Sequence, residues 1–215
     1  LEEEASGFGQ LLLGSRIVTA NIGECDLRER FRAIDDGRTF WEHAGEAGYR
    51  PEQWRDCAHI LNDLRSWVEV HIEQGRILQD SGRRLGIVHT IAGYVHGDIT
   101  ITGRADHAGA TPMPGRMDSA VVAGMTIAEL ERLALAAGSG TVGTVGEIEV
   151  EAGVINAVPG RTRISVDVRG PADELVSRVV RDVVAFAATV ADGRRMQASY
   201  GERQAVNAVP MDGGV

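Results

Sequence analysis

The order of strand and helix patterns in the second half of the chain constrains its fold most strongly. Strand patterns alternate apolar and polar residues, as at Ile164, Val166 and Val168, whereas helix patterns repeat apolar residues every three to four positions. Six such segments follow one another as strand, helix, strand, strand, helix and strand: 97–103, about 117–136, 141–151, 161–169, a helix from Pro171 onward, and 196–200. This is the order of the ferredoxin-like split βαβ unit, so we predict an α+β sandwich over residues 91–205. We expect Asp118 or Ser119 to cap its first helix.

The first part of the chain follows a different pattern. Residues 28–79 are mostly helical in character. A short β-prone run at 67–70 then precedes His71 and predicts that this histidine lies at the end of a strand, where open α/β sheets hold ligand-binding groups. We therefore assign the chain to the α/β class, with a partial α/β domain over residues 1–90 ahead of the sandwich.

Charge and composition narrow the class of partner. The 215 residues carry a net charge of −9, which argues against nucleic acid and anionic membranes, because both bind basic surfaces. All 22 basic residues are arginine, so Schiff-base, pyridoxal-phosphate and Walker-type mechanisms that need a lysine are excluded. The sequence contains no run of about 18 apolar residues, which is the length needed to span a bilayer. We expect a small-molecule ligand, with no nucleic acid and no membrane as partner.

The two cysteines indicate a reducing environment. Cys25 and Cys57 are far apart and outside any CxxC pattern, so neither a disulfide framework nor a thiolate metal site is indicated. No charged-then-apolar leader opens the chain. The cytoplasm is the expected location.

Two clusters in the first part of the chain, one of carboxylates and one around a histidine, could supply ligands to a metal site. In Glu2-Glu3-Glu4, one carboxylate could bind a cation while its neighbour takes a proton from water, although an acidic run is usually a solvated face. His71, with Glu73 and Gln74 nearby, could supply a nitrogen ligand, although a single histidine is more often a hydrogen-bonded structural residue. No complete metal site can be written from these residues.

A third cluster lies in the sandwich, in segments 106–113, 156–160 and 167–169. His107 stands in a loop rich in Gly, Thr and Pro, from which it could donate to a developing oxyanion. Asn156 and Arg169 could together bind a carboxylate, since a guanidinium does so with two hydrogen bonds. The alternative interpretation is two ordinary turns and a surface arginine.

Together and in this order, these clusters resemble the zinc-dependent hydantoinase/carbamoylase amidase family, within the aminoacylase and carboxypeptidase-G metallopeptidase superfamily. That family includes N-carbamoyl-L-amino acid hydrolases, β-ureidopropionases and allantoate amidohydrolases. The most specific part of the resemblance is HIEQG at 71–75 followed by HAGATPM at 107–113. It extends over nearly the whole chain, through EEEASGF, GSR, DDGRTFWEHA, GTVGEIEV, NAVPG and DVRGP.

The resemblance implies two divalent metal ions, zinc, manganese or cobalt. Glu3 resembles the general base, Glu4 the adjacent metal ligand, and His71 a ligand of one of the two metals. The family's first histidine and bridging aspartate would lie before residue 1 and its last histidine beyond residue 215. We therefore expect this chain to be an incomplete, inactive fragment of a longer protein.

The resemblance also implies a substrate site and a dimer. His107 is similar to the lid histidine that polarises the scissile carbonyl, often from across a dimer interface. Asn156 and Arg169 match positions that hold a substrate carboxylate, and Gln74 matches a pocket residue near the metals. Family members are typically homodimers joined through the sandwich. Tyr94-Val95 departs from the family's usual Gln-Arg, and this change leaves the identity of the substrate undetermined.

The same resemblance gives a role to each part of the chain and a reaction. Residues 1–90 would be a partial metal-binding catalytic domain, 91–205 the lid and dimerisation domain, and 206–215 a return segment to the catalytic domain. The implied function is metal-dependent cleavage of the carbamoyl or ureido C–N bond of N-carbamoyl amino acids or allantoate. The alternatives are a non-catalytic dimerisation or binding fragment, and an aminoacylase or peptidase relative.

Overall fold

The chain forms two compact units in a computed structural model: unit 1, Leu1–Gln74, and unit 2, Gly75–Val215. The structure describes residues 7–10, 12–151 and 153–214. None of the helices in these ranges has the length and apolar character needed to cross a membrane.

Short helices make up the described part of unit 1. They are α1 (Leu13–Val18), the π-helical turn η1 (Asp26–Arg30), α2 (Phe40–Glu46) and the 3-10 helix η2 (Pro51–Asp63). The helix α2 begins at a capping box, in which the Thr39 hydroxyl accepts from the Glu42 N–H and the Glu42 carboxylate accepts from the Thr39 N–H. The helices enclose a small apolar core that includes Leu27 and Trp54.

The strand that we predicted just before His71 is wrong. Residues 64–73 have no helix or strand, and the Val70 side chain is 94% exposed. A strand needs a neighbour that takes up its backbone hydrogen bonds. Within the described residues of unit 1, the only β pairing is the isolated bridge between Arg32 and Thr39. Within the described part of unit 1, the β-prone residues at 67–70 therefore have no neighbouring strand with which to pair.

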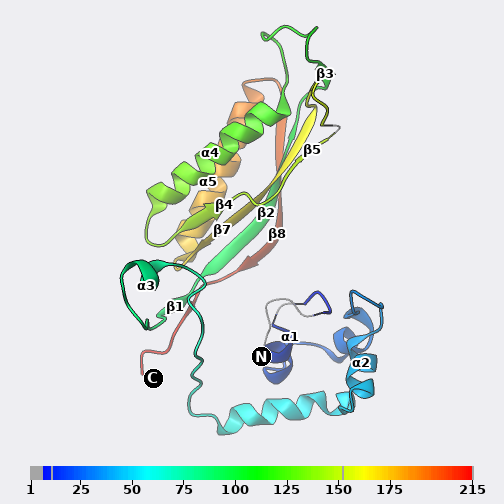
Figure 1. Cartoon of the computed structure of the whole chain (residues 1–215), viewed down its shortest axis with the longest axis vertical. Helices are drawn as coiled ribbons and strands as arrows, with labels where there is room; N and C mark the ends of the chain where they lie inside the picture. Colours follow the sequence, from blue (N-terminus) through cyan, green and yellow to red (C-terminus); the bar gives the residue numbers. More distant parts are fainter. Residues whose placement is uncertain (1–6, 11, 152, 215) are drawn as a thin grey trace. The chain divides into compact units, whose positions relative to one another are not determined.

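Unit 2 is built on an antiparallel sheet with the strand order β4-β7-β2-β8, in which β5 also pairs with β7. Two long helices, α4 and α5, lie side by side against one face of this sheet (Figure 1). The elements are α3 (Ile77–Asp80), β1 (Thr90–Ile91), β2 (Gly93–Thr102), β3 (Asp106–His107), α4 (Ser119–Ala137), β4 (Val142–Thr144), β5 (Ile148–Val150), β6 (Ala157–Val158), β7 (Arg161–Gly170), α5 (Asp173–Asp192), β8 (Gln197–Val206) and β9 (Val209–Pro210). The predicted β-α-β-β-α-β order is confirmed, with β4 and β5 together forming its third segment.

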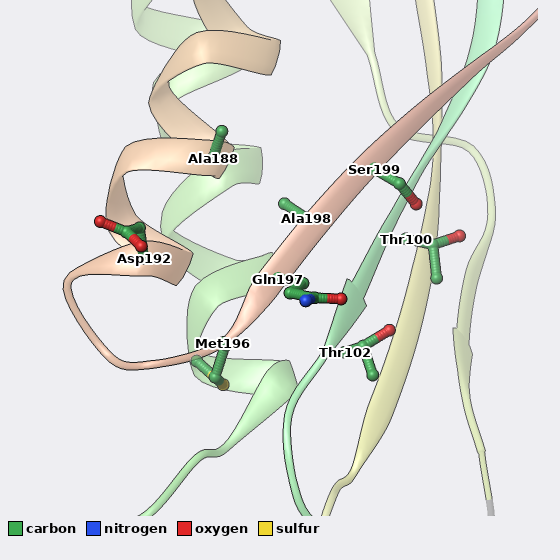
Figure 2. Close-up of a pocket in the computed structure, with 8 residues that line it drawn as sticks. All are labelled: Thr100, Thr102, Ala188, Asp192, Met196, Gln197, Ala198 and Ser199. Carbon is green, nitrogen blue, oxygen red and sulfur yellow. The ribbon is translucent and has the colours of Figure 1, made fainter.

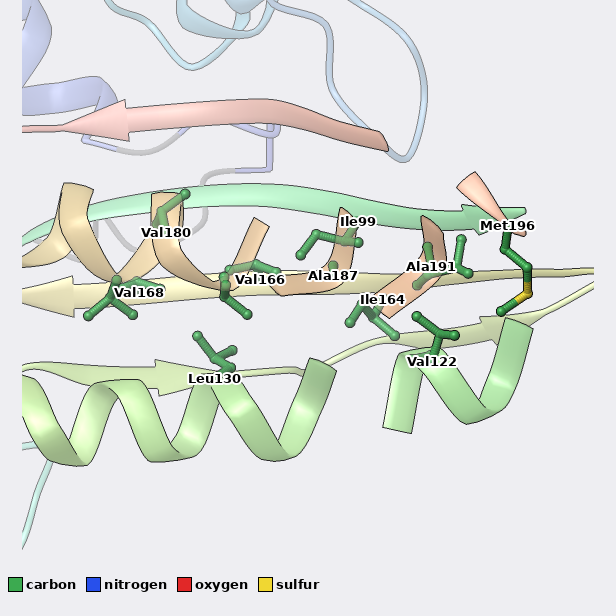
Figure 3. Packing of buried hydrophobic residues seen from close by; sticks show 14 of the residues in the cluster. Ile99, Val122, Leu130, Ile164, Val166, Val168, Val180, Ala187, Ala191 and Met196 are labelled. Atoms are coloured by element: carbon green, nitrogen blue, oxygen red, sulfur yellow. The ribbon is translucent and has the colours of Figure 1, made fainter. Parts of the chain in front are cut away.

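The core of unit 2 lies between the helices and the sheet (Figure 3). The alternation at Ile164, Val166 and Val168 turns these side chains toward the helices, where all three are buried. The N-terminus of α4 is capped by Asp118, whose carboxylate accepts hydrogen bonds from the backbone N–H groups of Ala120 and Val121 in the first turn. One of the two predicted caps is thus confirmed.

The opposite face of the sheet, which we call the open face, is polar. The Asp98 carboxylate on β2 accepts hydrogen bonds from Arg163 on β7 at 2.7 Å and from Arg203 on β8 at 2.5 and 2.7 Å. One carboxylate therefore ties three adjacent strands together on this face.

Candidate functional site

The predicted metal-site residues belong to unit 1. Glu3 and Glu4 lie outside the described residues. His71 is exposed, and its Nδ1 lies 2.5 Å from the carbonyl oxygen of Ile72. Because a carbonyl can only accept, Nδ1 is the donor and Nε2 carries the lone pair. Gln74 is exposed and has a left-handed backbone conformation, with φ at +54°.

His107 anchors a tight turn at one end of unit 2. Its Nδ1 accepts hydrogen bonds from the backbone N–H groups of Gly109 at 3.1 Å and Ala110 at 3.2 Å. Its carbonyl oxygen accepts from the Thr111 hydroxyl at 2.8 Å. Since a neutral imidazole carries one proton, occupation of Nδ1 as an acceptor places that proton on Nε2. The His107 turn, residues 107–111, thus presents an N–H donor from an exposed side chain.

Asn156 lies beside this turn. The short strands β3 and β6 pair with each other, and His107 lies opposite Ala157 in this pair. The carbonyl of Asn156 accepts a hydrogen bond from the Ala108 N–H at 2.9 Å. The pairing brings together two predicted residues that are separated by 49 positions in the sequence. The structure therefore supports a common location for His107 and Asn156.

Sequence reasoning missed Arg116, which holds the His107 turn in place. Its Nε donates to the Thr111 carbonyl at 3.0 Å, and its Nη2 donates to the Ala108 carbonyl. An arginine five residues after the loop gives no distinctive signal, because its partners are backbone carbonyls. The fork geometry of the guanidinium lets one side chain fix both ends of the turn.

Arg169 lies on the open face near the end of β7. Its Nε and Nη2 donate to the two carboxylate oxygens of Asp167 at 2.9 and 2.8 Å, and its guanidinium carbon lies 5.5 Å from the centre of the Tyr94 ring. The hydrogen bond with Asp167 raises the pKa of Arg169 above its usual value. His96 completes a group of four, the Arg169 cluster: Tyr94, His96, Asp167 and Arg169.

This arrangement leaves one edge of the Arg169 guanidinium available. Asp167 occupies the Nε side, and no described residue is bonded to Nη1. Two N–H groups that point forward from the end of a guanidinium can bind a second carboxylate with two hydrogen bonds. Tyr94 and His96 could have been recognised from the two-residue alternation of β2, which places them on the same face.

The two ends of the sheet separate the predicted substrate residues. Figure 1 shows β3 at one end of the sheet and β1 at the other. Asn156 precedes β6, which pairs with β3, whereas Arg169 pairs with Tyr94 near the start of β2, which follows β1. The eight steps of extended strand between Arg161 and Arg169 span about 26 Å at about 3.3 Å per residue. Within one chain, therefore, the structure brings His107 and Asn156 together but leaves Arg169 apart from them.

Two other features of the described residues do not coincide with the predicted site. A shallow hollow of about 320 Å³ lies between β2, β8 and the end of α5, and none of the predicted residues lines it (Figure 2). Asp35, Asp36 and His43 in unit 1 are close enough to share a cation. Hydrogen bonds from Arg38 and His43 already satisfy Asp36 and lower its pKa, so this group is explained as an ionic cluster.

Comparisons with known proteins agree with these motifs. Residues 90–195 match a family model described as a peptidase dimerisation domain. The N-carbamoyl-L-amino-acid amidohydrolase of Paenarthrobacter aurescens is 34% identical over 200 residues, which are 89% of this chain and 48% of that protein. The allantoate amidohydrolase of Bacillus subtilis is 31% identical over 219 residues, which cover 98% of this chain and 50% of that protein. A crystal structure of a hydantoinase/carbamoylase family amidase from Burkholderia ambifaria aligns with a TM-score of 0.84 and 27% identity, over 99% of this chain and 51% of that one.

The chain belongs to the hydantoinase/carbamoylase family of amidases, as its motifs predicted. It spans about half the length of the curated relatives that it matches. The matched dimerisation domain contains the His107 turn, Asn156 and the Arg169 cluster.

Proposed function

We propose that this chain is part of a metal-dependent amidohydrolase that cleaves the carbamoyl or ureido C–N bond of N-carbamoyl amino acids or allantoate. The His107 turn carries the proposal, because backbone donors occupy Nδ1 and leave Nε2–H to donate beside Asn156. Relatives that are 34% and 31% identical are named for this class of reaction.

Two divalent metal ions, zinc, manganese or cobalt, are the proposed cofactors. Glu4 and His71 are the residues of this chain that would hold them, and the remaining ligands would come from polypeptide outside it. His71 suits the role, because donation from Nδ1 to the Ile72 carbonyl leaves the Nε2 lone pair for a cation, as in metal-binding histidines generally. When bound, such metals supply an activated water.

The chain's own residues would carry the other steps. Glu3 takes a proton from the attacking water and passes it to the leaving nitrogen. The Nε2–H of His107 donates to the oxygen on which negative charge develops. Asn156 and Arg169 bind the substrate carboxylate, and Gln74 contacts the substrate near the metals.

The separation along β7 favours a site shared between two copies of the chain. A small carboxylate substrate is much shorter than the roughly 26 Å between the ends of β7, so His107 and Arg169 of one chain cannot both touch it. In a homodimer, His107 and Asn156 of one protomer would complete the site that holds Arg169 of the other. A closed two-fold dimer would then contain two such sites.

The outer side of α4 supports a homodimer through the sandwich. Val121, Met125 and Leu135 on this helix are exposed, although its inner side is already packed on the sheet. The outer side of α5 instead carries charged residues such as Arg181 and Asp182. The exposed charged residues Glu131 and Arg132 interrupt this surface of α4, but its other exposed residues are apolar or small, as is typical of a surface that a partner covers.

The cytoplasm is the proposed location. Cys25 and Cys57 are both exposed and unpaired. Free, exposed thiols persist in a reducing compartment, whereas secreted proteins tend to pair them.

Mixed dimers test the reaction and the shared site together. A form of the protein extended to the length of its relatives and loaded with Mn²⁺, Zn²⁺ or Co²⁺ should release ammonia from allantoate, N-carbamoyl-β-alanine or N-carbamoyl-L-amino acids. At substrate concentrations well below KM, His107→Ala and Arg169→Ala homodimers should each have at most about a tenth of the wild-type activity. Random mixing of the two should restore about a quarter of wild-type activity, because half of the dimers are mixed and each of these has one intact site.

Two outcomes would contradict these proposals. Mixed dimers that form but stay inactive would show that His107 and Arg169 do not act across the interface. A metal-loaded, dimeric wild-type protein that releases no ammonia from any of these substrates would favour the non-catalytic dimerisation module instead.

A further inference from the structure

The imidazole of His96 lies between the two charged groups of the Arg169 cluster. Its Nε2 is 3.3 Å from Oδ1 of Asp167 and 3.5 Å from Nη2 of Arg169. Its ring stacks on Tyr94, with 4.4 Å between ring centroids and an interplanar angle of 27°. Tyr94 in turn lies beneath the Arg169 guanidinium. A single ring therefore contacts every other member of the cluster.

Nε2 of His96 can satisfy only one of its two charged neighbours. A neutral ring uses Nε2 either to donate to Asp167 or to accept from Arg169. A protonated ring can only donate, so it binds Asp167 and repels Arg169. Protonation thus turns the cluster into one carboxylate shared by two cations.

The net charge of the cluster decides how well it attracts an anion. Arg169 and Asp167 cancel each other, so with a neutral His96 an incoming carboxylate meets hydrogen-bond donors but no net positive charge. A proton on His96 gives the cluster a net charge of +1. At an effective dielectric constant of about 40, between the values for a protein surface and for bulk water, a unit charge at about 6 Å changes the affinity for an anion by about tenfold.

We propose that His96 is a positioning residue for carboxylate binding: its imidazolium holds Asp167, so that the forward edge of Arg169 meets the substrate carboxylate with a net positive charge. This inference rests on the proposed function, in which Arg169 binds that carboxylate. Affinity for the carboxylate should be higher when His96 is protonated, and therefore higher at acid than at alkaline pH.

The other groups that face His96 are already paired or neutral. On β7 these are Asp167 and Arg169, and on β2 they are Tyr94 and Asp98, of which Asp98 is bound by two arginines. On β8, Gln204 stands opposite His96, and the nearest charged side chains are Arg203, paired with Asp98, and Glu202, which alternates to the helix side with Tyr200. The pH response should therefore come from His96 itself.

Equilibrium binding to a ligand that the enzyme cannot hydrolyse tests this role apart from catalysis. Calorimetric titration of the metal-loaded, extended protein would use N-methylsulfonyl-L-alanine, which has a carboxylate but no ureido group, and its carboxamide analogue. The wild type should bind the carboxylate about tenfold more tightly at pH 5.5 than at pH 8.5 and should bind the carboxamide equally at both. His96→Gln keeps a hydrogen-bonding side chain of similar size without a charge, and should bind the carboxylate at both pH values with the wild-type affinity of pH 8.5.

The matched control is His89→Gln, a change of another exposed histidine of unit 2 that precedes β1. It should retain the wild-type pH dependence. A carboxylate affinity that does not vary with pH in the wild type, or that varies equally in His96→Gln, would overturn the role of His96. Failure of the proposed function would be seen separately, as absence of ammonia release from ureido substrates.

Discussion

The hydroxyl of Ser119 lies 2.8 Å from that of Thr162, at the buried junction where α4 begins against β7. Both residues are almost fully buried, and Ser119 also donates to the Pro159 carbonyl at 3.0 Å. Ser119→Ala should therefore lower the free energy of unfolding by about 1–3 kcal/mol, because the Thr162 hydroxyl loses its partner. Urea denaturation would measure the loss. Ser177→Ala, on the exposed side of α5, is the control, and equal stability of the two variants would contradict the prediction.

Asp98 should make stability depend on acid pH. Burial alone would raise its pKa, but hydrogen bonds from Arg203 and Arg163 outweigh burial and hold the pKa below the usual 3.8. A folded-state pKa below the unfolded value means that ionised Asp98 stabilises the fold above that value, and that this contribution disappears as the pH falls through the folded-state pKa. Asp98→Asn should therefore lose less stability than the wild type between pH 7 and pH 3 in urea titrations.

The control for this effect is Asp182→Asn, at an exposed position on α5. It should follow the wild-type curve at both pH values. If Asp98→Asn loses as much stability on acidification as the wild type, the ion pairs of Asp98 with Arg163 and Arg203 have no part in the acid response.

Arg169→Ala should raise the KM for carboxylate substrates by about ten- to a hundredfold with a smaller change in kcat. Charge-assisted hydrogen bonds contribute about 1.5–3 kcal/mol, and this guanidinium binds the substrate rather than the reacting atoms. Steady-state kinetics with N-carbamoyl-L-alanine would measure both constants. Arg181→Ala on the outer side of α5 should leave both unchanged, and an unaltered KM in Arg169→Ala would remove Arg169 from the carboxylate site.

Arg116→Ala should reduce kcat by about ten- to a hundredfold while changing KM little. The substitution removes two hydrogen bonds that hold the His107 turn, and a small displacement of a donor weakens transition-state binding more than ground-state binding. Comparison of kcat and KM in dimers of wild-type stability separates this effect from unfolding. A change in KM alone would point to a substrate contact instead.

The fold of unit 2 was predictable because its signals are local and mutually consistent. The alternation of Ile164, Val166 and Val168, and the carboxylate at 118 ahead of an apolar helix, each specify an element without reference to distant residues. The prediction of a strand at 67–70 was wrong because a strand depends on a neighbouring strand and not on local signals alone. β-propensity reports how well side chains suit a sheet, but it cannot supply the neighbouring strand.

The candidate site was predictable only as a set of residues. Motif order identified His107, Asn156 and Arg169, but sequence spacing could not show that the first two meet through the β3–β6 pair while the third stands at the far end of β7. Arg116 and His96 were missed because their roles depend on three-dimensional contacts, with backbone carbonyls in one case and with an ion pair in the other.

Because side chains alternate between the two faces of β7, insertions of odd and of even length should have different effects. Inserting or deleting one residue near Ser165 would rotate Asp167 and Arg169 onto the helix-covered side, where an ion pair would displace apolar side chains. A two-residue change would restore their orientation but would move them by about 6.6 Å relative to the turn at the other end. The fold should therefore tolerate insertions in this strand only when they contain an even number of residues. Each tolerated pair of residues would also change the distance between Arg169 and the His107 turn, and so the distance over which two protomers must align to form a shared substrate site.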